Sequence, residues 1–286
     1  MIYLLLSILF STITVSFFKA FELKGVHTFQ AIVVNYVTCS LLGNILSPQT
    51  IFTQHVWTSD WFPIAVILGF LFISIFNFIA QTAQKLGVST SMVAAKLSVV
   101  VPVVMAIILY DETLNWGKGV GILLSLVAVY FISKKENEGT HTLKNLWHLP
   151  ILVFLGSGCI DSLLNYVEQN YIPPFDTDTI LTSVFSVAFV FGSAYLIFLY
   201  MKGKLEFRWK NIYWGIFLGI PNYFSMVFLV KTLGVFHGSF IFPLNNIGIV
   251  AASTLTAVLL FKEHLSIQNK VGLGLAVISI LLISLV

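Results

Sequence analysis

Two charged side chains occur inside apolar segments that are long enough to cross a membrane. Lys96 lies about seven residues into a segment that begins at Ser89, and Asp161 lies about twelve residues into one that begins at Leu149. Both segments start from the same face, so a helix rise of about 1.5 Å per residue puts the two groups within about 7 Å in depth. Charges inside a membrane are costly unless they pair, bind an ion or face water. The pattern predicts a central cavity that holds a zwitterion or an anion and exchanges protons. The alternatives are a structural ion pair and a lysine that reaches the nearby interface.

Uncharged polar side chains lie in other apolar segments, at depths where lipid offers no hydrogen-bond partner. Asn77 and Gln81 are four residues apart and therefore share one helix face. Asn222 and Asn245 follow prolines, which remove an amide donor and free a carbonyl. Hydrogen bonds that only pack helices together are an equally good explanation. The predicted cavity residues are Lys96, Asp161, Asn77, Gln81, Asn222, Tyr223, Asn245 and Asn246, and the predicted helix breaks are Pro102, Pro221 and Pro243.

Carboxylates near the ends of the apolar segments suggest caps more than chemistry. Glu112 and Glu263 recur at corresponding places in two similar stretches, where a carboxylate accepts hydrogen bonds from free backbone amides of a helix end. Asp176 and Asp178 form a D-x-D pair, which in a membrane glycosyltransferase would hold a divalent metal on a diphosphate. A cap for the helix that begins at Thr177 is the favoured interpretation. We therefore expect no metal site and no cofactor.

The composition identifies an all-α polytopic membrane protein. Residues of the hydrophobic type make up 58% of the chain and charged residues only 9%, far below the charged share of a soluble domain. Cys39 and Cys159 lie in apolar runs and are interpreted as structural. Requiring about 20 mostly apolar residues per span predicts ten transmembrane helices. They cover Ile2–Phe18, Thr28–Leu46, Trp61–Ala83, Ser89–Tyr110, Trp116–Ser133, Leu149–Val167, Thr177–Tyr200, Ile212–Thr232, Gly238–Phe261 and Ile267–Val286.

The stretch Leu86–Ser133 is repeated as Leu233–Ser284. Each copy opens with Leu-Gly-Val, continues with a long apolar run, and carries a glutamate nine residues before a glycine. Such duplication is common in transporters. It predicts a first five-helix repeat over residues 1–137, a polar linker over 138–147 and a second repeat over 148–286. With an odd number of spans in each half, the two repeats have inverted topology, and we expect the third, fourth, eighth and ninth spans to line the cavity.

Basic residues are concentrated on one face of the predicted bundle. Twelve of the fifteen Lys and Arg residues lie at the connections that follow the first, third, fifth, seventh and ninth spans. We call this the basic face. Lys and Arg normally stay in the cytoplasm, so the loop charges place both termini outside.

The two acidic breaks, YDETL at Tyr110–Leu114 and FKEHL at Phe261–Leu265, resemble those of the drug/metabolite transporter superfamily, and most closely its EamA-type branch with ten helices. Pro102 in the fourth span and Lys19 at the end of the first add to this resemblance, which covers essentially the whole chain. It implies a carrier of amino acids or other metabolites. It also implies termini in the cytoplasm, against the loop charges. The first span lacks the membrane-embedded glutamate of the four-helix multidrug members, so their proton coupling is not implied.

We therefore expect a secondary transporter, an exporter or exchanger of a small polar metabolite such as an amino acid, that works by alternating access and is not an enzyme. The alternatives are a metal-dependent membrane glycosyltransferase and a channel. The expected partners are the substrate, the lipid bilayer, a coupled proton or counter-substrate, and in a homodimer a second copy, but no nucleic acid. A multi-pass protein of a bacterial inner (plasma) membrane is the expected localisation.

Overall fold

The computed structural model describes residues 1–46, 54–110, 115–133, 146–171, 177–233, 235–236 and 238–285. All the regular structure in these ranges is helical. The helices are α1 (Ile2–Lys24), α2 (Thr28–Leu46), α3 (Gln54–Trp57), α4 (Phe62–Lys85), α5 (Val88–Leu97), α6 (Val100–Tyr110), α7 (Trp116–Ser133), α8 (His148–Tyr171), α9 (Thr177–Met201), α10 (Trp209–Leu233), α11 (Gly238–Leu259) and α12 (Ile267–Leu285).

The predicted spans agree closely with these helices, and two differences are informative. The short helix α3 precedes the third span, and the fourth span is divided into α5 and α6 by a turn at Ser98 and Val99. The turn comes just before Pro102, whose ring cannot donate a backbone hydrogen bond to the preceding turn. By contrast, the predicted break at Pro221 does not interrupt its helix, because α10 continues through this residue. α11 likewise extends across Pro243.

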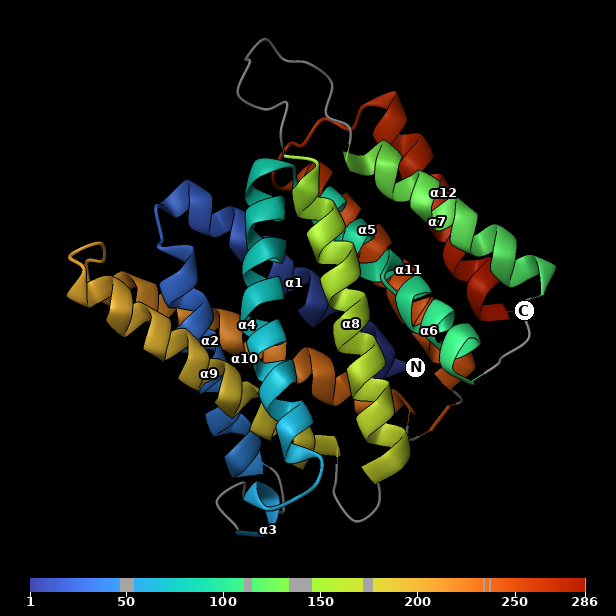
Figure 1. Cartoon of the computed structure of the whole chain (residues 1–286). Helices are drawn as coiled ribbons and strands as arrows, with labels where there is room; N and C mark the ends of the chain where they lie inside the picture. The colour runs from blue at the N-terminus through green and yellow to red at the C-terminus, as the bar shows by residue number, and fades with distance from the viewer. Residues whose placement is uncertain are drawn as a thin grey trace.

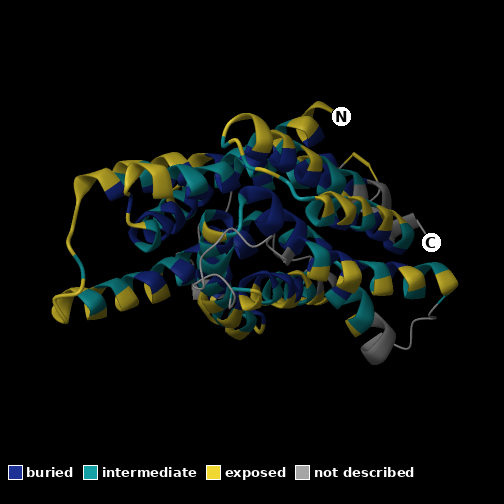
Figure 2. Cartoon of the chain, turned by 90° about the horizontal axis from the view of Figure 1, so that it is seen from above, coloured by how far each residue is buried: buried dark blue, intermediate teal, exposed yellow. Residues whose placement is uncertain are grey.

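The helices have the length and surface of membrane spans. Six of them, in the described part of the chain, are long and apolar enough to cross a membrane, and four shorter apolar stretches accompany them. Large apolar side chains such as Leu123 and Val190 are more than 60% exposed. Figure 2 shows exposed residues along the outer sides of the helices and buried ones toward the interior. An outer surface of this kind is stable in lipid, so the chain is a polytopic, multi-pass membrane protein.

The bundle has two ends that are joined by a central group of helices (Figure 1). α7 packs along α12 at one end, while α2, α9 and α10 form the other. Between them, α5 packs against α4, α8 and α11, and α1 packs against α10, α11 and α4. Residues 138–145 of the predicted linker lie outside the described residues, and the boundaries of the two repeats stay a prediction.

Close helix approaches fix the end formed by α2 and α10. A Cβ on Gly215 would lie 2.7 Å from the carbonyl oxygen of Ala31, and one on Gly219 would lie 2.6 Å from Cβ of Thr38. Only glycine permits this separation. At the basic face, the backbone N–H of His27 donates to Oδ1 of Asn211 at 3.0 Å, which anchors the connection before α2 to the start of α10.

Candidate functional site

Lys96 lies in the last turn of α5, directly before the interruption of the fourth span. The N–H of Val101 bonds to the carbonyl of Ser98 at 2.8 Å and forms a tight turn in place of the regular helical bond. A break inside a span is tolerated where its backbone is buried in protein or lines a cavity. α5 packs against α4, α8 and α11 at this level, so Lys96 belongs to the centre of the bundle.

Asp161 faces this centre from α8. It interacts electrostatically with Lys96, without an ion pair between them in the described structure. The hydroxyl of Ser98 lies 3.0 Å from Oδ2 of Asp161 and 2.6 Å from the carbonyl oxygen of Ala95, and can donate to either. Ser98 thus connects the helix break to the carboxylate. Sequence inspection missed this serine, although a polar residue between a charge and a proline was a usable signal.

The exposed surface of Asp161 is directed into the bundle. Leu155 and Cys159 are exposed on the outer side of α8. Asp161 follows Cys159 by two residues, which at 3.6 residues per turn is about 200° around the helix. It shares its side of α8 with buried Phe154 and Gly158, yet is itself exposed. An exposed carboxylate among buried neighbours indicates space for water or a ligand beside it.

Amide side chains from α4 and α11 lie near the same depth. The hydroxyl of Ser91 bonds to the carbonyl of Ile79 at 2.8 Å, and Ser89 bonds to Thr254 at 2.8 Å, which fixes α5 relative to α4 and α11. Counting residues from these contacts with a rise of about 1.5 Å places three of the amides within about one helical turn of Lys96 in depth, and Gln81 about two turns from it. These amides are Asn77 and Gln81 on α4 and Asn245 and Asn246 on α11.

These groups lack hydrogen-bond partners of their own. Within the described part of the chain, Lys96, Asn77, Gln81 and Asn246 make no side-chain hydrogen bond, and the buried Asn245 leaves its Oδ1 unpaired. Polar groups as buried as Asn245 are normally satisfied, whereas the other four side chains are half-buried and open to water or a ligand. Unsatisfied donors and acceptors from three helices, near two charges, are the arrangement that a polar ligand would complete.

Asn222 and Tyr223 belong to a different contact. The amide of Asn222 donates to Oδ1 of Asn35 at 3.1 Å, and the thiol of Cys39 donates to the carbonyl of Gly219 at 3.4 Å. Tyr223 is buried in the same region. The structure therefore places these residues between α10 and α2, and not beside Lys96. The eighth span, which corresponds to α10, was expected to line the cavity. Near Lys96 its place is taken by the sixth span, which corresponds to α8.

Of the two acidic breaks, the structure describes the one that contains Glu263 but not the glutamate of the other. Glu263 follows α11, and its Oε1 accepts the N–H of Val88 at 3.0 Å, so it caps the start of α5 on a neighbouring helix. Glu112 and Asp176 lie outside the described residues. Asp178 lies in the first turn of α9, where a carboxylate is favoured by the free amides of a helix start.

Comparison with known proteins supports a transporter. Residues 1–134 match the EamA-like transporter family, which confirms the resemblance to the drug/metabolite transporter superfamily over that range. A Haemophilus influenzae protein, described as an uncharacterized protein, is 27% identical over 277 residues, or 94% of this chain and 93% of that protein. A crystal structure of a protein aligns with 98% of this chain and 97% of its own, at a TM-score of 0.60 and 14% identity, which concerns the fold alone.

Proposed function

We propose that this chain, whose residues 1–134 match a family of membrane transporters and not of enzymes, is a secondary transporter of a small polar metabolite. The observation that carries the proposal is the unpaired set around Lys96 and Asp161. The ammonium of Lys96 can bind a carboxylate, and Asp161 can bind an ammonium group. The amides of Asn77 and Asn245 supply further hydrogen bonds. A zwitterion such as an amino acid would satisfy all of them.

The transport mechanism we propose is alternating access between two inverted five-helix repeats. The packing supports this, because α2 packs on α10 as α4 packs on α9, and α1 packs on α10 as α4 packs on α8. If each span of the first half is exchanged with the span five places later, the α2–α10 contact becomes the α9–α4 contact. The α1–α10 contact becomes the α8–α4 contact in the same way. We further propose that the protein exports or exchanges its substrate across a bacterial inner membrane. Transport is coupled to a proton or a counter-substrate, and the protein is a monomer or a homodimer. The glycosyltransferase hypothesis gains no supporting geometry from the described residues.

A thermal-shift screen tests the proposal. The purified protein in detergent is heated with amino acids, organic acids, nucleotides or cationic drugs, beside Lys96→Ala and the control Lys270→Ala, an exposed lysine on α12. A ligand that binds the folded state raises the midpoint by mass action. We expect zwitterions to stabilise the wild type and Lys270→Ala but not Lys96→Ala. Stabilisation that persists in Lys96→Ala would show that Lys96 does not bind the ligand. In a separate flux measurement, conductance that does not saturate with substrate would favour a channel.

A further inference from the structure

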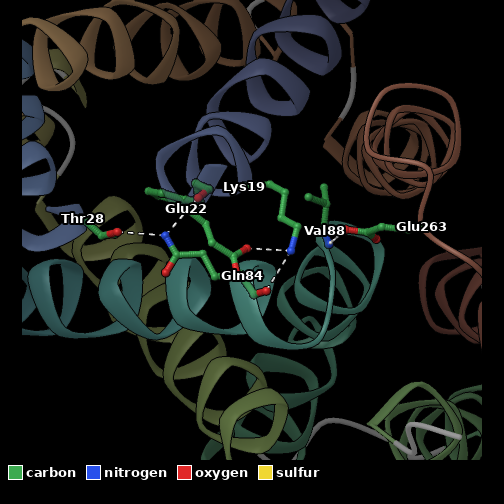
Figure 3. A network of polar contacts seen from close by, with 7 residues as sticks. Lys19, Glu22, Thr28, Gln84, Val88 and Glu263 are labelled. Carbon is green, nitrogen blue, oxygen red and sulfur yellow. Dashed lines mark hydrogen bonds and ion pairs between the residues drawn. The ribbon is translucent and has the colours of Figure 1, made fainter. Parts of the chain in front are cut away.

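A cluster of polar contacts joins different helices at the basic face, where α5 begins (Figure 3). The carboxylate of Glu263 accepts the N–H of Val88 at 3.0 Å. Gly87 makes this contact possible. It has a φ of +109°, which disfavours other residues, and a Cβ there would lie 2.7 Å from Oε2 of Glu263. The end of α11 is thereby fastened to the start of α5.

A second group of contacts fastens α1 to α4 beside it. Nζ of Lys19 donates to Oε2 of Glu22 at 2.6 Å and to the carbonyl of Gln84 at 2.9 Å. The side chain of Gln84 donates in turn to the carbonyl of Phe18 at 2.9 Å and to Oγ1 of Thr28 at 2.8 Å. Figure 3 shows Lys19 and Gln84 between these partners. Five helices, α1, α2, α4, α5 and α11, thus take part in these contacts at one face.

The second copy of the Leu-Gly-Val motif lies in the opposite environment. Val88 ends the first copy and is 0% exposed, whereas Val235 ends the second copy at the opposite face and is 69% exposed. The following residues differ in the same sense, since Ser89 is buried and Phe236 is exposed. In the described part of the chain, α1 packs against α4 and α5, but α8 has no comparable packing against α10 or α11.

We infer that the Val88–Glu263 bond and the Lys19–Gln84 contact form a latch, which closes the central site at the basic face while the site opens toward the opposite face. This inference rests on the proposed transport function, since a latch on one face has a role only if the site must be exposed to each side in turn. Loss of the latch shifts the population toward a state that is open at the basic face.

Cysteine labelling in lipid nanodiscs tests the latch, because both faces are then open to a hydrophilic maleimide. Cys159→Ser provides the background, since Cys159 is exposed while Cys39 is buried. In this background Val235→Cys is expected to react at least about tenfold faster than Val88→Cys, because buried backbone and side chain must open before reaction. Equal rates would overturn the inference.

Variants that break the latch provide a second test. Adding Glu263→Gln to Val88→Cys is expected to raise its labelling rate by about tenfold, the effect of losing one charge-assisted hydrogen bond. Glu206→Gln is the matched control, because Glu206 is also on the basic face but is exposed, and among the described residues its carboxylate pairs only with Arg208. The rate in this control should stay unchanged.

Lys19→Met tests the latch without touching α5 and should also raise the Val88→Cys rate. Each variant is combined with Val235→Cys as well. Because the two faces open in turn, labelling of Val235→Cys should not accelerate, and acceleration at both positions would indicate unfolding instead of release of a latch. If neither Glu263→Gln nor Lys19→Met accelerates labelling, the contacts are not a latch. No substrate is needed, so a latch that behaves as expected in a protein without transport activity would contradict the proposed function and not the latch.

Discussion

The electrostatic interaction between Lys96 and Asp161 gives the sharpest prediction for the central site. Lys96→Met removes the ammonium and keeps most of the side-chain length, and Asp161→Asn removes the opposite charge at nearly constant shape. Two unit charges about 6 Å apart attract by about 3 kcal/mol at an effective dielectric constant of about 20. Because Asp161 is exposed, solvent screening lowers this attraction to about 1–2 kcal/mol.

A double-mutant cycle measures this attraction. The wild type, both single variants and the double variant are unfolded in detergent, and their free energies of unfolding are compared. We expect the double variant to lose about 1–2 kcal/mol less than the sum of the single losses, because each single change leaves one uncompensated charge inside the bundle. A cycle of Lys96→Met with Glu206→Gln is the control and should be additive.

Additivity within about 0.5 kcal/mol for Lys96→Met and Asp161→Asn would refute the reasoning. The two charges would then be independent, and the site would not present a matched pair to a zwitterion. A bound amino acid should reduce the measured coupling, since each charge then interacts with the ligand. The cycle repeated at saturating ligand therefore connects the stability measurement to binding.

Two further predictions concern the basic face. Gly87→Ala should destabilise the protein by about 1–3 kcal/mol, because Gly87 has a positive φ and Glu263 lies close to it. Gly119→Ala is the control, since a Cβ there meets open space. If Gly87→Ala loses no more stability than Gly119→Ala, the stated strain is contradicted. Partial desolvation lowers the pKa of His27 below its ordinary value of 6.5. Protonation then favours the unfolded state, so thermal stability should be greatest above pH 6.5 and fall below it, and His27→Asn should weaken this dependence over pH 5 to 8. An unchanged pH profile in the variant would exclude His27 as the cause.

The helical architecture was predictable because each span must bury its backbone hydrogen bonds within itself. Apolar length alone therefore located Thr28–Leu46 and Trp116–Ser133, and both helices have these bounds. The division of the fourth span at Ser98 was not predictable in detail. Proline weakens one backbone bond, but whether the helix breaks depends on its neighbours, and α10 passes through Pro221 without interruption.

The candidate site was only partly accessible to sequence reasoning. A charge in an apolar segment is expensive wherever it lies, so Lys96 and Asp161 were recognisable before any fold was known. Asn222 carries the same signal as Asn245, yet packs against Asn35 on α2. A polar residue must find a partner, and the sequence does not say whether this is a ligand or another helix.

The sequence by itself determined the class of protein, the limits of the helices and the presence of charges within them, because these follow from composition and local periodicity. Tertiary structure alone decided which helices meet. It brought Ser98 to Asp161, separated Asn222 from Lys96, and placed Glu263 on the amide of Val88. These contacts join residues 63 to 187 positions apart, and their geometry depends on the packing of whole helices and not on any local pattern.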